Sequence, residues 1–218
     1  MDRRLDHRSV SLADQIFEKL EKDILSGVYN RGEIITEMKL SEMLGVSRTP
    51  VREAIRRLEQ EHIITITSKG IEVCGISRED IESIYEIRVR IEGYAARCAA
   101  ERITDDELNR LKETLDLQNF YLQKGDAERI MDCDSRFHKL VYQATGRMPL
   151  CDTLTELHKK IIKFRRVSVE LTERAQHSCE EHASIYYALA AHDGAKADAL
   201  TVEHICNARE NILKHMDK

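Results

Sequence analysis

The sequence is poor in several features, and each scarcity excludes a class of protein. Two prolines and nine glycines in 218 residues, with no low-complexity tract, leave little room for a long disordered segment. There is no apolar run of about 18 residues and no signal peptide, because the N-terminus is charged, so we expect a cytoplasmic protein without a membrane partner. The six cysteines form no Cys-x-x-Cys pair, which favours reduced, partly buried thiols over a disulfide framework.

A large positive charge is also absent. The net charge is −5, and neither half of the chain is basic: residues 1–75 hold 12 Lys and Arg against 13 Asp and Glu, and residues 76–218 hold 22 against 26. Residues 47–57 alone hold four Arg and one Glu. Binding to nucleic acid would therefore rely on one local basic face, with modest non-specific affinity and a marked dependence on salt.

Residues 46–58, with the sequence VSRTPVREAIRRL, predict an amphipathic helix. Ser47 or Thr49 can cap this helix, because a short side-chain oxygen accepts hydrogen bonds from the free amides of the first turn. Pro50 is tolerated in that turn, where its missing N–H costs nothing. The inward stripe consists of Val51, Ile55 and Leu58.

The basic face of this helix consists of Arg48, Arg52 and Arg56, at positions i, i+4 and i+8. Like charges at this spacing repel one another, so the face favours an anion, and guanidinium groups suit phosphates and the O6/N7 edge of guanine. The alternative is a solvated, Arg-rich helix. Residues 37–44 favour the first interpretation, because they predict a short helix that Thr36 caps and Gly45 ends. A helix, a glycine turn and an Arg-rich helix form the helix-turn-helix pattern, which places its second helix in the major groove of DNA.

Residues 63–74, IITITSKGIEVC, predict a β-hairpin with its turn at residues 68–70. After a helix-turn-helix, such a hairpin is the wing, and Lys69 and Gly70 would then lie near the minor groove. The alternative is a hairpin turn without a role in binding.

The stretch from Gly45 to Glu59, GVSRTPVREAIRRLE, resembles the recognition-helix signature of GntR-family transcription regulators, and its TPVREA segment is typical of the FadR subfamily. The resemblance implies a homodimer that binds an inverted-repeat operator in double-stranded DNA. We assign base contacts to Arg48 and Arg52. We assign phosphate contacts to Ser47, Thr49 and Arg56, and wing contacts to Lys69 and Gly70. Many relatives carry an arginine where this chain has Met38 and Lys39, so base readout from that helix is doubtful.

The composition is that of a mostly α protein. We expect a winged helix-turn-helix domain with a small β-hairpin wing over residues 1–75, beginning with a charged arm at residues 1–10 for which DNA contact is one alternative. An all-α antiparallel bundle over residues 76–218 follows. The helices of the bundle are expected at 78–101, 104–124, 126–144, 147–170, 173–192 and 195–216. By size and helix count this half resembles the FCD effector domain of the FadR subfamily.

Four polar residues of the second half occupy positions where apolar ones belong. Asp134 and His138 lie on the apolar stripe of helix 126–144, and His182 and His204 continue the stripes of helices 173–192 and 195–216. Buried polar groups are costly unless they are paired, and one metal ion would satisfy all four. The donor set suits Zn²⁺, Ni²⁺ or a similar ion. A hydrogen-bonded polar core is the alternative.

The segment DSRFH is similar to the D-x-x-F-H motif of metal-binding FCD domains, and the segments EHASI and VEHI look like their two later ligand sites. The resemblance implies a divalent metal bound by Asp134, His138, His182 and His204, with zinc as the first choice and nickel or manganese as alternatives. His158 and His177 do not match the pattern, and we expect ordinary roles for both.

Arg88 lies on the apolar stripe of helix 78–101, and a buried arginine needs a carboxylate partner. Glu92, four residues later, is the internal candidate. The segment EIRVRIE resembles the FCD segment whose first arginine often lines the effector cavity, which implies that Arg88 binds a small carboxylate effector beside the metal.

The sequence thus predicts a DNA-binding regulator, expected from the resemblance to be a repressor, whose helical domain binds a metal and a small organic acid. Two alternatives remain. The ion itself can be the signal, or the chain can be a mononuclear metalloenzyme. No acid–base motif accompanies the four ligands, and the Arg-rich helix would be unexplained in an enzyme, so we expect no catalytic activity.

Overall fold

The computed structural model describes residues 11–168 and 173–216, so the expected arm at residues 1–10 and the last two residues of helix 147–170 lie outside the described residues. The chain divides into two compact units, with the boundary between Ser77 and Arg78. Each unit has its own hydrophobic core, and each is described by itself.

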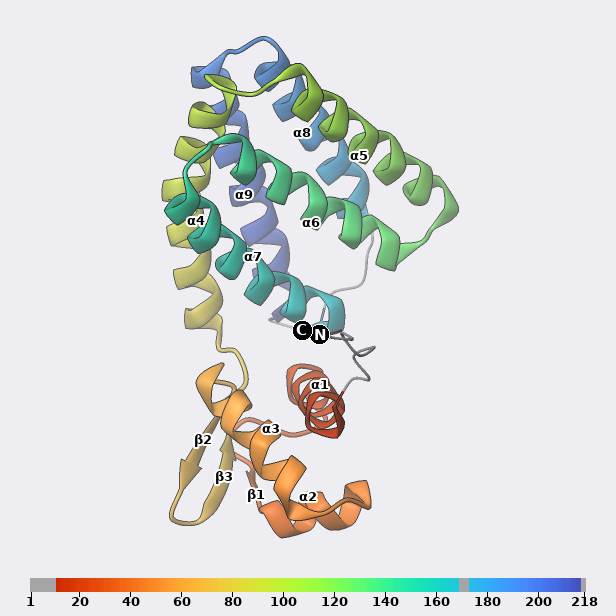
Figure 1. Ribbon diagram of the computed structural model, residues 1–218, viewed down its shortest axis with the longest axis vertical. Helices are drawn as coiled ribbons and strands as arrows, with labels where there is room; N and C mark the ends of the chain where they lie inside the picture. The colour runs from red at the N-terminus through yellow and green to blue at the C-terminus, as the bar shows by residue number, and fades with distance from the viewer. Residues whose placement is uncertain (1–10, 169–172, 217–218) are drawn as a thin grey trace, which may run out of the picture. The chain divides into compact units, whose positions relative to one another are not determined.

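Over its described residues, 11–77, the N-terminal unit contains three helices and three short strands (Figure 1). They follow in the order α1 (Leu12–Leu25), β1 (Ile34–Ile35), α2 (Glu37–Leu44), α3 (Arg48–Gln60), β2 (Ile64–Thr67) and β3 (Gly70–Val73). Thr36 caps α2 by accepting from the amide of Lys39, and Gly45 ends it with a left-handed φ of 65°. Ser47 holds the cap position of α3 as expected, but its side chain makes no capping hydrogen bond, so that part of the prediction is wrong.

The sheet is antiparallel in the order β1-β3-β2, with Thr67 opposite Gly70 at the hairpin end. The hairpin therefore turns at Ser68 and Lys69, and Gly70 is already the first residue of β3. A Cβ at Gly70 would lie 2.8 Å from the carbonyl oxygen of Ile35, and the φ of Gly70 is 136°. Glycine is thus required here so that β1 can approach β3.

The core of the N-terminal unit lies between α1, α3 and the sheet. The expected inward stripe of α3 is confirmed, because Val51, Ile55 and Leu58 are buried together with Ala54. They pack in one cluster with residues of α1 and of the sheet, among them Phe17, Leu20, Ile24, Ile64 and Ile71. This packing fixes α3 so that its opposite face stays exposed.

The helical unit contains six α-helices within the described residues (Figure 1). They are α4 (Arg78–Ala100), α5 (Asp105–Lys124), α6 (Ala127–Ala144), α7 (Met148–Ser168), α8 (Glu173–Ala190) and α9 (Gly194–Met216). Each begins and ends within about two residues of its expected position where both ends are described. Thr104 and Glu107 form the capping box that starts α5, as their spacing predicts. The prediction of a mostly helical chain with a small wing and a helical second half is confirmed.

The helices α4 and α9 pack closely along their lengths, with α8 beside α9 and α5 beside α6 (Figure 1). A Cβ at Gly93 of α4 would lie 2.2 Å from Oδ1 of Asp198 and 2.7 Å from Cγ2 of Val202, both on α9, so the two helices leave no room for a side chain there. A large apolar cluster from α4, α5, α6, α8 and α9 fills one end of the bundle. No helix of the described residues is long and apolar enough to cross a membrane.

Candidate metal centre and DNA-reading face

The seven residues assigned to DNA contact all lie on the N-terminal unit, and six of them are exposed. Arg48, Thr49, Arg52 and Arg56 are exposed along α3, and Ser47 is exposed just before it. Lys69 is exposed at the tip of the hairpin, whereas Gly70 is half-buried against β1. The fourth arginine of the run, Arg57, points to the other side, where it pairs with Asp14 and lies 4.1 Å above the ring of Phe17.

Arg48 and Arg52 share a partner that the sequence analysis did not identify. Glu37, in the first turn of α2, accepts from Arg52 at 2.9 and 3.2 Å and from Arg48 at 3.2 Å. The hydrogen bond from Arg52 and the charge of Arg48 lower the pKa of Glu37 below its usual value, so the carboxylate is ionised at neutral pH. Because all three side chains are partly exposed, this cluster is open to exchange with another anion.

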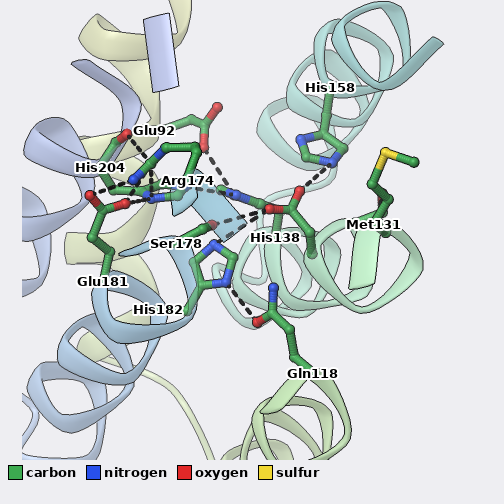
Figure 2. A network of polar contacts seen from close by, with 12 residues as sticks. Glu92, Gln118, Met131, His138, His158, Arg174, Ser178, Glu181, His182 and His204 are labelled. Carbon is green, nitrogen blue, oxygen red and sulfur yellow. Dashed lines mark hydrogen bonds and ion pairs between the residues drawn. The ribbon is translucent and has the colours of Figure 1, made fainter. Parts of the chain in front are cut away.

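Three predicted metal ligands converge in the core of the helical unit. His138 of α6, His182 of α8 and His204 of α9 are buried, and each offers a ring nitrogen within 4.8 Å of the others (Figure 2). The Nε2 atoms of His138 and His204 are 3.2 Å apart, and Nε2 of His182 has no hydrogen-bond partner among the described residues. Three buried nitrogens directed at one point are the arrangement that a metal ion would satisfy.

The other ring nitrogen of each histidine faces an acceptor. Nδ1 of His204 lies 2.6 Å from Glu181, Nδ1 of His182 lies 3.1 Å from the amide oxygen of Gln118, and Nδ1 of His138 lies 3.3 Å from Glu92 (Figure 2). Carboxylate and amide oxygens only accept, so each Nδ1 carries the hydrogen and each Nε2 keeps its lone pair. Lone pairs of two Nε2 atoms at 3.2 Å repel each other unless a cation lies near both. The residues present therefore fit a bound metal ion.

Asp134, the fourth predicted ligand, is buried one turn before His138. Its Oδ1 lies 3.9 Å from Nε2 of His182 and 3.5 Å from the hydroxyl of Ser178. The carboxylate is thus beside the three histidines rather than among them, since only the imidazole nitrogens lie within 4.8 Å of one another. The structure thus brings three of the four predicted ligands together and places the fourth, Asp134, next to them.

Arg88 has the internal partner that the sequence offered as its alternative. Its Nε donates to Glu92 at 2.5 Å, with both side chains at most 3% exposed, and its guanidinium lies 5.1 Å from the ring centre of Tyr85. Burial alone would raise the pKa of Glu92, but the charge of Arg88 and the contact with His138 lower it below its usual value. Arg88, Glu92 and His138 form a chain, in which Arg88 reaches the histidines only through Glu92.

Burial also determines the protonation of the histidines. It lowers the pKa of His182 well below the ordinary value and lowers that of His204, although Glu181 opposes the change at His204. Glu181 itself is surrounded by donors: burial raises its pKa, but His204, Arg174 and Asn207 bring it down to about 2. The rings of His182 and His204 are therefore neutral at pH 7, which is the form that binds metals.

A further buried histidine lies beside this cluster. His158 of α7 is 6% exposed, and its ring centre is 4.8 Å from that of His138. The sequence places His158 on an apolar stripe, because Leu154, His158 and Ile161 follow one another at i, i+4 and i+7, and all three are buried. The same criterion selected the other three histidines. His177, the other histidine set aside, is exposed.

Two cavities adjoin the cluster. A small one of about 10 Å³ is lined by Asp134, Arg174, His204 and their neighbours. A larger, open groove of about 550 Å³ runs between α8 and α9, and it is lined by Arg174, Glu181, Asn207 and other polar residues. Arg174 lines both, and its guanidinium donates to Glu181 at 2.6 and 2.8 Å. It is the basic residue placed between the open groove and the histidines.

Comparison with protein families assigns both units. The profile of the FCD domain matches residues 83–207, and the profile of the bacterial regulatory proteins of the gntR family matches residues 12–73. The chain belongs to the gntR family, in the form that carries an FCD domain. It is therefore a DNA-binding transcription regulator with an FCD effector domain. FCD domains often bind a metal ion, and His138, His182 and His204 form a possible site for one in this regulator.

Individual relatives agree with this assignment. The chain is 27% identical to the HTH-type transcriptional repressor RspR of Escherichia coli over 91% of this chain and 87% of that protein. It is 30% identical to the Nta operon transcriptional regulator of Aminobacter aminovorans over 85% and 87%. The solved structure of E. coli McbR/YncC has the same fold, with a TM-score of 0.70 at 24% identity over 96% of this chain and all of the other. These relatives are regulators rather than enzymes, as the sequence predicts.

Proposed function

We propose that this gntR-family regulator is a homodimeric repressor of an inverted-repeat operator, controlled by a divalent metal ion and a small organic acid. The observation that carries the proposal is that His138, His182 and His204 are buried with ring nitrogens within 4.8 Å of one another, while Nδ1 of each faces a carboxylate or amide oxygen. Three imidazoles buried in this way are costly unless their nitrogens are satisfied.

For the metal, the proposed ligands are His138, His182, His204 and Asp134. Nitrogen and carboxylate donors suit zinc first, and nickel or manganese as alternatives. The carboxylate lies close enough to join the histidines after a small rotation, because its Oδ1 is 3.9 Å from Nε2 of His182. A bound ion would supply a Lewis-acid position at which the carboxylate of an effector can bind.

For the effector, Arg174 is a better anchor than Arg88. Arg88 is buried and paired with Glu92, so a ligand would have to displace that carboxylate. Arg174 is half-buried, lines the open groove and lies 3.4 Å from Nδ1 of His204. We therefore propose that the effector carboxylate binds Arg174 and the ion, whereas Arg88 supports the site through Glu92. Loss of effector binding in Arg88→Met but not in Arg174→Met would reverse this assignment.

On DNA, the proposed base contacts are those of Arg48 and Arg52, and the phosphate contacts are those of Ser47, Thr49 and Arg56. The exposed arginines support this role, as does the hydroxyl of Ser47, which is not used as a cap. Lys69 at the hairpin tip is the proposed wing contact, whereas Gly70 acts mainly through the shape of the sheet. Arg52→Ala is expected to reduce operator selection by about 1–3 kcal/mol in a binding assay with operator and mutated operator.

For the direction of control, repression is proposed because a similar protein is named as a repressor. An effector that binds one conformation of the helical domain better than another shifts the population of DNA-binding states. We expect the organic acid to release the operator.

The test of the metal centre is elemental analysis of the purified protein. We expect about one ion per chain, lost in a His182→Ala/His204→Ala double variant and reduced in Asp134→Ala, with the helical circular dichroism signal retained. His177→Ala is the matched control, because His177 is an exposed histidine on the same helix as His182. Wild-type protein that binds no metal even after loading would leave a hydrogen-bonded polar core instead.

One observation favours a second candidate, in which the ion itself is the signal. The cavity directly beside Asp134 and His204 holds about 10 Å³, which is room for about one water molecule and not for an organic acid. Metal affinity separates the two functions. A metal sensor must gain and lose its ion over the range of free-metal concentrations to which it responds, so its affinity is matched to that range. An ion that serves effector binding stays bound over the whole range, so its affinity is tighter.

A further inference from the structure

His158 is the buried imidazole that the proposed ligand set leaves over. Neither of its ring nitrogens has a hydrogen-bond partner among the described residues, although the side chain is only 6% exposed. A buried polar group left without a partner destabilises the folded protein. The position would therefore favour an apolar residue unless the imidazole has a task.

On the side of the cluster, His158 approaches a carboxylate oxygen. Nε2 of His158 lies 3.9 Å from Oδ2 of Asp134, and Figure 2 shows the ring of His158 approaching from α7. The other oxygen of the same carboxylate, Oδ1, is the one that lies 3.9 Å from Nε2 of His182 and 3.5 Å from Ser178. The two oxygens of Asp134 thus face two different helices, α7 with Oδ2 and α8 with Oδ1.

His158 differs from the three clustered histidines in its surroundings. Its ring contacts are with His138 and Tyr142, and its nitrogens lie outside the group of three that come within 4.8 Å of one another. His158 therefore lies beside Asp134 and is not one of the three clustered histidines.

We propose that His158 is a positioning residue for Asp134: its Nε2–H donates to Oδ2, and this fixes the carboxylate with Oδ1 presented to the ion held by His138, His182 and His204. The inference rests on the proposed metal site. The present separation is about 1 Å longer than a hydrogen bond, and a small turn of the carboxylate closes it. A carboxylate held in this way loses less freedom when it binds the ion.

Metal affinity of the full chain, measured with Zn²⁺ in competition with a chromophoric chelator, tests the inference. His158→Phe fills the same space without a donor, and we expect a loss of affinity of about 10–100-fold. His158→Gln keeps an N–H donor and should retain affinity within a few-fold. His177→Phe, on the exposed face of α8, is the control and should change nothing. If His158→Phe lowers the helical circular dichroism signal, His158→Leu replaces it.

A double-variant comparison separates positioning from direct ligation. In an Asp134→Ala background, His158→Phe should cause no further loss of affinity, because the carboxylate through which it acts is gone. A further loss of the same size would mean that His158 binds the ion itself and would overturn the inference. The visible absorption bands of bound Co²⁺ give a second readout: they should shift in His158→Phe and return toward the wild-type positions in His158→Gln.

The two proposals fail in different ways. Wild-type protein without affinity for Zn²⁺ removes the metal site and the inference together. Wild-type protein that binds Zn²⁺, with His158→Phe binding equally well, removes the inference and leaves the site intact.

Discussion

Each unit of the molecule contains an ion pair between arginine and glutamate, and the two pairs differ in their exposure to water. In the N-terminal unit, Glu37 pairs with Arg48 and Arg52, whose side chains are 61% and 51% exposed. In the helical unit, Arg88 and Glu92 are 3% and 1% exposed. The atoms are of the same kind and the distances are similar, so the difference lies in the access of water.

Water makes the first pairing exchangeable and the second fixed. An exposed ion pair contributes about 1 kcal/mol or less, so a DNA phosphate or guanine edge can replace Glu37 at little cost. Two charges in the core have lost their hydration, and each is tolerated only because of the other. The exposed pair is suited to binding, and the buried pair to holding His138 in place.

The largest expected effect comes from breaking the buried pair. Glu92→Ala leaves the charge of Arg88 buried without its carboxylate, and we expect a loss of about 3–5 kcal/mol in the free energy of unfolding of the metal-stripped protein. Glu37→Ala should cost less than about 1 kcal/mol. Urea unfolding followed by circular dichroism measures both.

A double variant sharpens this result. Arg88→Met/Glu92→Leu removes both charges and keeps apolar volume, so it should recover most of the stability lost in Glu92→Ala. Equal losses in the single and double variants would mean that packing, and not the unpaired charge, sets the cost.

The next effect concerns Gly93, beside the buried pair on α4. Alanine in the middle of a helix usually stabilises it, but a Cβ here would lie 2.2 Å from Asp198 and 2.7 Å from Val202. We expect Gly93→Ala to destabilise the protein by about 1–3 kcal/mol, measured by the same unfolding experiment. Gly194→Ala, where the nearest atom is the flexible Cγ of Arg97 at 3.1 Å, is the matched control and should be nearly neutral.

A smaller effect is expected on DNA binding. Glu37→Gln removes the negative charge from the two arginines, so affinity for random-sequence DNA should rise about two- to fivefold at low salt. Glu42→Gln removes the same charge from an exposed position on the same helix and is the control. Fluorescence anisotropy with a labelled duplex measures both, and an equal rise in the two variants would show that only net charge matters.

The smallest effect is a dependence of stability on pH. The hydrogen bond from Arg52 holds the pKa of Glu37 below its ordinary value of 4.5, so its contribution to stability is present above that pH. It is lost as the pH falls through the lower, folded-state value. The difference in unfolding free energy between wild type and Glu37→Gln should stay within about 1 kcal/mol at pH 7 and shrink toward zero in acid. A difference independent of pH would exclude the carboxylate as its cause.

Periodicity in the sequence predicts the helices and the polar residues that face inward, because both follow from the 3.6-residue repeat. It predicts the stripe of α3 and the burial of Asp134, His138, His182 and His204. The same periodicity places His158 on an apolar stripe, although His158 matches no family motif, and the structure shows that it is buried.

Partners from other helices could not be predicted in this way. Glu37 meets Arg52 from 15 positions away and Gln118 meets His182 from 64 positions away, and such pairings depend on how the helices pack. The hydrogen-bond acceptors of His182 and His204, which are Gln118 and Glu181, and the carboxylate of Glu92 beside His138 therefore appear only in the folded structure. For Arg88 the sequence allowed two carboxylate partners, Glu92 of the same helix or a bound effector. The choice between them needed the structure, in which Arg88 and Glu92 are paired and buried.

The helix α4 runs without a break from the first residue of the helical unit to the buried pair of Arg88 and Glu92. It begins at Arg78, the first residue of the helical unit, and Glu92 follows 14 positions later, with neither glycine nor proline between them. That stretch is a rod of about 21 Å. We expect a helix without such breaks to move as a whole when Glu92 moves. Residues 74–77, which precede it, belong to no helix or strand, and Gly75 among them has a φ of 61°.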